Sequence, residues 1–201
     1  MWMSSAYEES GRVNQKQRTR RALIDAARAL LAQGLTPTVE QAAAAANVSR
    51  PTAYRYFPNQ HALLIAAHPE LQMESLLPQP APGDPIARLD SASAELMRLL
   101  LEHETALRAM FRISADKTPA TIPPLALRTG RRIRWIEDAL APVRDRLGAE
   151  RFHRLVLQIG ATLGIEPLMW LIDIAHVQRE EAAEILRDAA RSLLKGALSA
   201  G

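Results

Sequence analysis

The stretch that decides the fold is residues 38–64, TVEQAAAAANVSRPTAYRYFPNQHALL. A threonine N-cap at its start predicts a helix over 39–46. Asn47 tolerates the left-handed conformation that a tight turn needs. Ser49 is a second N-cap and predicts a further helix that ends near Tyr56. Two short helices joined by a turn of two or three residues predict a helix-turn-helix.

The sequence on both sides of this stretch predicts more helices. The 201 residues include 35 Ala and 28 Leu against 12 Ile and 6 Val, which favours helix over strand. We expect an all-α fold with a helix-turn-helix domain over 12–60 and a larger helical domain over 61–201. Residues 1–11 are expected to form a disordered tail. Further helices are predicted over 17–33, 61–77, 86–104, 105–114, 125–147, 150–174 and 180–197.

Positive charge is concentrated near the N-terminus. Residues 12–60 carry 8 Lys and Arg against 2 acids, whereas residues 61–201 carry 17 basic and 18 acidic side chains. This asymmetry indicates a polyanion-binding unit, with a merely solvated basic face as the alternative.

The sequence argues against several classes of protein and of functional site. The chain has no cysteine, which excludes disulfides, thiolate zinc sites and a cysteine nucleophile. No stretch approaches 18 uncharged apolar residues and the N-terminus has no apolar signal, so we expect a cytoplasmic protein that does not enter the membrane. The five histidines are scattered, and there is no glycine-rich phosphate loop, so no enzyme, metal or cofactor is expected.

The 38–64 stretch resembles the helix-turn-helix of the TetR family of transcriptional regulators, and residues 17–33 resemble that family's first helix. The matching positions are Thr38, Val39, Ala43, Ala46, Val48, Ser49, Thr52, Tyr54, Phe57 and Leu63 or Leu64. The resemblance implies a homodimer that binds a palindromic operator in double-stranded DNA. It also implies an effector-binding C-terminal half.

Residues expected to contact DNA lie in and around the second helix of the motif. Arg50 is expected to bind a guanine edge and Thr52 a thymine methyl group. Tyr54, Tyr56 and helix-start amides are expected to donate to phosphate. The full set is Arg18, Arg20, Thr38, Ser49, Arg50, Pro51, Thr52, Tyr54, Arg55, Tyr56 and Gln60. A solvated arm is the alternative for the arginines at 18, 20 and 21.

Some positions depart from the family pattern. Asn47 replaces the usual turn glycine, and Ala42 replaces the usual isoleucine, so we expect a thinly packed core. Gln60 replaces a lysine at a helix start. Because a phosphate-binding cation is absent there, we expect weaker non-specific affinity for DNA and a shallower salt dependence.

The C-terminal half is expected to dimerise through its last two helices, about 150–197. The small residues of 160–165 allow close helix approach, either across a dimer interface or within the chain. Large apolar residues in the middle helices are candidates for binding a mostly apolar effector, with ordinary core packing as the alternative. They are Met97, His103, Met110, Phe111, Trp135, Met169 and Trp170.

Three hypotheses follow from these patterns. The first is a repressor that a small effector releases from its operator. The second is a DNA-binding regulator whose C-terminal domain recognises a protein partner instead. The third, an enzyme, has no motif to support it. Arg128, Arg131 and Arg132 share a helix face that suits an acidic ligand, with a solvated face as the alternative.

Overall fold

The computed structural model describes residues 4–68, 73–115 and 131–199, with side chains from residue 14 onward and not at 113–115. Every regular element in these ranges is a helix, and the expectation of an all-α fold is confirmed. The chain divides into two compact units. The first holds helices α1 to α4 and the second half of α6. The second holds the first half of α6, α5, and α7 to α11.

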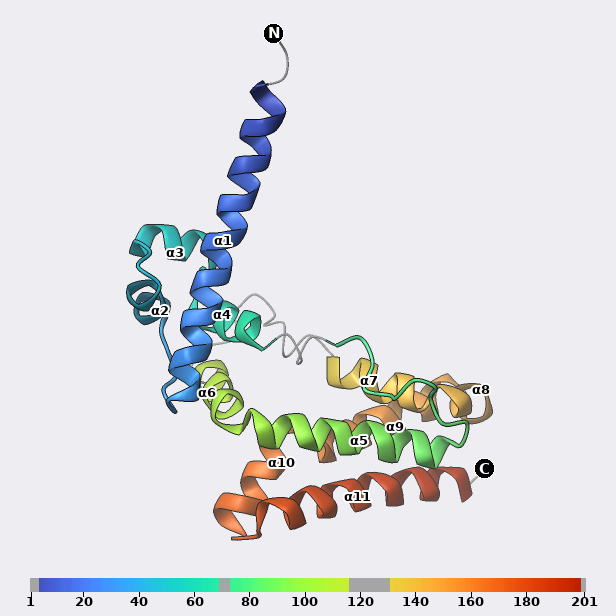
Figure 1. Ribbon diagram of the computed structural model, residues 1–201. Coiled ribbons are helices and arrows are strands. Elements are labelled where there is room, and N and C mark those ends of the chain that lie inside the picture. The colour runs from blue at the N-terminus through green and yellow to red at the C-terminus, as the bar shows by residue number, and fades with distance from the viewer. Residues whose placement is uncertain (1–3, 69–72, 116–130, 200–201) are drawn as a thin grey trace. The chain divides into compact units, whose positions relative to one another are not determined.

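In the first unit, helices α1 to α4 follow one another along the chain (Figure 1). Helix α1 packs on α2 and α4, and α2 packs on α3. Their bounds are α1 (Ser4–Ala32), α2 (Val39–Ala45), α3 (Arg50–Tyr56) and α4 (Gln60–Ala67). The expectation of a disordered tail over 1–11 is wrong from Ser4 onward. Helix α1 already begins at Ser4.

The core of the first unit consists of small and medium side chains. Leu23 and Ala27 from α1 pack against Ala42 and Ala43 from α2, and all four are fully or almost fully buried. Leu63 of α4 is also part of this core. Ala42, at the position where the family pattern has isoleucine, is thus fully buried, and thin packing of this core stays a prediction.

Helix α4 is shorter than predicted, because it ends at Ala67 rather than near Leu77. Pro69 disfavours helical conformation at the preceding His68, which ends the helix. By its contacts α4 belongs to the first unit. The expected domain boundary between residues 60 and 61 stays a prediction, because compactness alone does not define a functional domain.

The second unit packs α11 along α5 and α9, and packs α7 against α5 and α9 (Figure 1). Its helices are α5 (Pro85–Glu102), α7 (Arg131–Ala139), α8 (Arg144–Leu147), α9 (Ala149–Thr162), α10 (Ile165–Met169) and α11 (Arg179–Ser199). A 3-10 turn, η3 (Ala141–Val143), and a π-helical turn, η4 (Trp170–Ile174), join some of them. Helix α6 (Glu104–Ala115) spans the division between the units.

Two predicted long helices are interrupted. Pro142 lies in the η3 turn that separates α7 from α8, so the helix predicted over 125–147 is not continuous among its described residues. The helix predicted over 150–174 breaks at Leu163 and Gly164, both of which have extended backbones. Arg132 Nη1 donates a hydrogen bond to the Leu163 carbonyl oxygen at 2.9 Å. A side chain from α7 therefore satisfies a carbonyl group that the helix leaves unpaired.

Ion pairs join the helices of the second unit. Asp90 of α5 accepts hydrogen bonds from Arg187 and Arg191 of α11 at 2.9 and 2.8 Å. Glu104 of α6 accepts from Arg108 at 2.7 Å and from Arg179 of α11 at 2.9 Å. These contacts set the position of α11 along its length.

Candidate nucleic-acid interface

The start of α2 is fixed by a reciprocal cap. The Thr38 backbone N–H donates to Gln41 Oε1 at 2.8 Å, and the Gln41 N–H donates to Thr38 Oγ1 at 3.2 Å. This capping box satisfies two N–H groups that the helix leaves free, and an N-cap of this kind stabilises a helix by about 1 kcal/mol. The Thr38 hydroxyl therefore has a structural partner in the protein.

The turn between α2 and α3 depends on Asn47, which has a φ of 53°. Asparagine adopts this left-handed conformation more readily than most residues. The next residue, Val48, donates its N–H to the Ala43 carbonyl at 2.8 Å, which closes the turn. Asn47 thus takes the place of the family's glycine and the turn stays closed, as predicted.

Helix α3 has one buried and one exposed side. Ala53 is fully buried, and Phe57, just after the helix, is 2% exposed. Arg50, Tyr54 and Arg55 are exposed. This division fixes the helix by one face and leaves the other open to a partner, which is how a recognition helix enters the major groove.

A carboxylate lies beside the exposed face of α3. Glu40 Oε1, in the first turn of α2, accepts hydrogen bonds from Arg50 Nη2 at 3.1 Å and from the Tyr54 hydroxyl. The hydrogen bond from Tyr54, with further ones from its own backbone, Thr38 and Arg50, lowers the pKa of Glu40 to about 2. The same bond raises the pKa of Tyr54. Glu40 is thus ionised at neutral pH.

Gln60, Tyr56 and Arg20, which were also expected to contact DNA, have partners within the protein. The Gln60 side-chain amide donates to the Thr36 and Pro37 carbonyls at 3.2 and 3.1 Å, and so holds the α1–α2 loop. Tyr56 is half-buried against the core. Arg20 has its guanidinium 5.5 Å from the centre of the Phe57 ring.

The remaining expected residues lie on the surface of the same unit. Arg18, Ser49 and Pro51 are exposed, and Thr52 is half-buried. The Ser49 hydroxyl donates to Thr52 Oγ1 at 2.9 Å. The DNA contacts stay predictions. Sequence reasoning missed Glu40, although a lone acid in a basic segment, one helix away from two predicted contacts, was a usable signal.

The residues expected to bind an effector differ in their exposure to solvent. Met97, Met110 and Trp135 are buried, and Trp135 Nε1 donates to the Met73 carbonyl at 2.8 Å. His103, Phe111 and Met169 are half-buried, whereas Trp170 is 58% exposed. The structure has a shallow groove between α9 and α11 and another between residues 73–78 and α5, and none of the seven residues lines either groove. Their role in binding an effector stays a prediction.

The predicted arginine face is only partly described. Arg132 pairs with Glu166 at 3.1 Å and with the Leu163 carbonyl. Arg131 is half-buried, and burial together with the nearby Arg134 lowers its pKa. Arg128 lies outside the described residues. Arg132, which was a candidate for binding an acidic ligand, therefore has partners within the protein.

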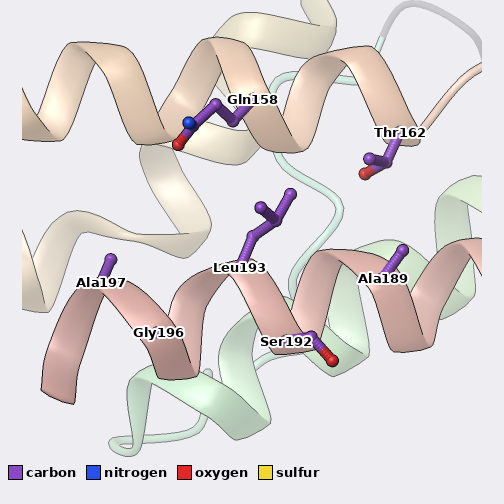
Figure 2. Close-up of a pocket in the computed structure, with 7 residues that line it drawn as sticks. All are labelled: Gln158, Thr162, Ala189, Ser192, Leu193, Gly196 and Ala197. Carbon is purple, nitrogen blue, oxygen red and sulfur yellow. The ribbon is translucent and has the colours of Figure 1, made fainter.

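Helices α9 and α11 form a shallow groove with small side chains. Leu193 points from α11 toward α9 (Figure 2). The lining residues are Gln158 and Thr162 of α9, with Ala189, Ser192, Leu193, Gly196 and Ala197 of α11. Leu157 of α9 and Ile185 of α11 are 47% and 41% exposed. The two helices thus present apolar surface that the described part of the chain does not cover.

Comparison with known proteins agrees with the geometry of the first unit. Residues 23–67 match the model of the family described as "Bacterial regulatory proteins, tetR family". This is a TetR-type helix-turn-helix domain. The match covers α2, α3, α4 and the second part of α1. The resemblance noted in the sequence is confirmed.

Relatives of the TetR-type domain include a repressor. The chain is 45% identical over 64 residues to the HTH-type transcriptional repressor LfrR of Mycolicibacterium smegmatis, a match that spans 32% of each protein. The crystal structure of a TetR transcriptional regulator from Rhodococcus sp. RHA1 has a TM-score of 0.65, with 21% identity. It covers 89% of this chain and 96% of that one. The second comparison shows a shared fold over the matched part of the chain.

Proposed function

We propose that this protein is a sequence-specific transcriptional repressor that binds a palindromic operator as a homodimer. The observation that carries the proposal is the open face of α3, where Arg50, Tyr54 and Arg55 are exposed on a helix anchored by its opposite side. Because only a helix or a β-ribbon fits the major groove, this face suits base contacts. The basic surface of α1 suits phosphate contacts.

Dimerisation through α9 and α11 is supported by their exposed apolar surface. The run Ala149–Ile174 is long and apolar enough to span a membrane by length and composition, but its helix breaks at Leu163. Only 39% of its most apolar 18-residue stretch is buried. Exposed patches of this kind mark interaction sites. A second copy of the chain, related by a twofold axis, would cover both helices and would present two α3 helices to half-sites about 34–36 Å apart.

Release by a small effector is the third part of the proposal. An effector in the second unit would shift the population between dimers that match the operator spacing and dimers that do not. The candidate residues Met97 and Trp135 of this unit are apolar and buried, as the walls of such a site are. A protein partner is the alternative, and the exposure of Trp170 supports it.

Selection from random double-stranded DNA tests the proposal. The expected result is an enriched palindrome that binds the full chain as a dimer in the cytoplasmic range of salt. Arg50→Ala should weaken binding to that palindrome and relax the preference at one base pair, since a bidentate contact contributes about 1–3 kcal/mol of discrimination. Arg146→Ala, which removes an exposed arginine from α8, is the matched control. If no palindrome is enriched, the proposal is wrong.

A further inference from the structure

Glu40 is the acidic side chain that contacts the open face of α3, and its geometry is specific. Its Oε1 atom is shared by two donors from the next helix, Arg50 Nη2 and the Tyr54 hydroxyl. Arg50 and Tyr54 are four residues apart, so they lie on the same side of α3. One carboxylate oxygen of α2 thus links two side chains that face the proposed partner.

The contact is open to solvent and to DNA. The Arg50 side chain is 72% exposed, and that of Glu40 is 32% exposed. An ion pair of this kind contributes little to folding, because water screens it. A role in stability is therefore a poor explanation for an acid placed on a DNA-facing surface, where it repels phosphate.

From this arrangement we infer that Glu40 is a specificity-determining residue, which positions Arg50 and Tyr54 and penalises DNA that offers them only phosphate. This inference rests on the proposed function.

The physical reasoning is a difference between two kinds of DNA. On non-specific DNA, the arginine gains a phosphate contact but must leave the carboxylate, and the carboxylate also repels the backbone. On the correct sequence, Arg50 gains the paired O6 and N7 acceptors of guanine, which compensate for the lost contact. Specificity is a difference of affinities, and a repulsive element against the wrong partner raises it.

The charge of Glu40 is permanent under binding conditions. Its pKa is lowered to about 2, first by the hydrogen bond from Tyr54. Acidification therefore does not remove the carboxylate's effect without damaging the protein, and substitution is the appropriate probe. Glu40→Gln removes the charge and keeps the size of the side chain.

The matched control removes another acid from the same unit. Asp25 of α1 is exposed and is the second of the two acids within residues 12–60. Asp25→Asn changes the net charge of the TetR-type domain by the same amount as Glu40→Gln. It leaves the contact between Glu40, Arg50 and Tyr54 intact, so any effect of charge alone appears in both variants.

The first measurement follows the free protein and needs no DNA. The hydrogen bond to Glu40 raises the pKa of Tyr54. One phenol of the wild-type protein should therefore ionise at a higher pH than the others when tyrosine ionisation is followed by ultraviolet absorbance. Tyr54→Phe removes that late titration and assigns it. Glu40→Gln should move it to lower pH while Asp25→Asn should not. If Glu40→Gln leaves the Tyr54 titration unchanged, the inference is overturned.

The second measurement is the ratio of affinities for the selected palindrome and for random DNA. For Glu40→Gln, the slope of log affinity against log salt on random DNA should steepen by about one. The specificity ratio should fall roughly tenfold, within the range of one lost base contact. In an Arg50→Ala background the same substitution should change the base preference no further, which a purely structural role would not predict.

The outcomes separate the inference from the proposed function. If the wild-type chain enriches a sequence but Glu40→Gln and Asp25→Asn lower specificity equally, net charge explains the effect and the role of Glu40 is refuted. If the late titration of Tyr54 is present but the wild-type chain enriches no sequence, the proposed function fails and the specificity role fails with it.

Discussion

Gly164 separates α9 from α10, and a single methyl group added there should displace Arg132. The Cβ atom of an alanine at position 164 would lie 1.7 Å from Arg132 Nη1 and 2.6 Å from Glu166 Oε2. The backbone at Gly164 is extended, with a φ of 179°, so alanine itself adopts it without strain. The destabilising part of the effect of Gly164→Ala should therefore come from the displaced side chains, above all the Arg132 guanidinium.

The expected cost follows from the contacts that Arg132 loses. Its bond to the carbonyl of the buried Leu163 is 2.9 Å long, and an unsatisfied buried acceptor costs about 1–3 kcal/mol. The ion pair with Glu166 adds little, because the two side chains are 36% and 46% exposed. A gain of about 0.4–1 kcal/mol from stiffening the unfolded chain opposes the loss. We expect a net destabilisation of about 1–2 kcal/mol.

Urea unfolding at a fixed protein concentration measures this effect, because the proposed dimerisation would make the midpoint depend on concentration. Gly83→Ala is the control, since its added Cβ meets no atom within 4 Å. In an Arg132→Ala background, Gly164→Ala should cost close to nothing, and the difference is the coupling between the two residues. A neutral Gly164→Ala variant, or an equal cost in both backgrounds, would refute the reasoning.

Three further predictions use other contacts. Gln60→Ala should lower the free energy of unfolding by about 1–2 kcal/mol through the loss of two bonds to backbone carbonyls, and should leave the salt slope of DNA binding unchanged; a shallower slope would instead show that Gln60 contacts phosphate. Burial raises the pKa of Glu104, but hydrogen bonds from Arg179 and Arg108 outweigh burial and lower this pKa below its ordinary value of 4.5. The ionised Glu104 therefore stabilises the fold fully above pH 4.5, and this stabilisation is lost as the pH falls through the lowered pKa of the folded protein. Acid unfolding of Glu104→Gln should consequently depend less on pH in that range than acid unfolding of the wild-type chain, and identical curves would contradict this. Leu157→Glu should convert the dimer to a monomer in analytical ultracentrifugation, and an unchanged dimer would place the interface elsewhere.

Local chemistry explains why much of the fold was predictable. N-caps such as Thr38, the turn residue Asn47 and the apolar spacing along each helix act over three or four residues. Their effect does not depend on distant parts of the chain. Two of the boundaries that failed lie where a proline or a distant side chain intervenes, at Pro69 and at Leu163, whose carbonyl is bonded by Arg132.

In the candidate interface, too, some residues were predicted from local sequence and others were placed by tertiary packing. Arg50 and Tyr54 were predicted from their place on a short helix after a turn, and the structure exposes both. Gln60 and Tyr56 were predicted by the same reasoning, but tertiary packing directs them to backbone carbonyls and to the core. Glu40 entered the site only through the packing of α2 on α3.

The sequence by itself determined the helical class, the helix-turn-helix and the basic character of the first unit, because these depend on propensity, capping and charge along the chain. Only the tertiary structure decided which partners the side chains take. It placed Glu40 between Arg50 and Tyr54, and it seated Arg132 against Gly164. Such contacts join residues 10 to 34 positions apart, and no local pattern encodes the approach of two helices that brings them together.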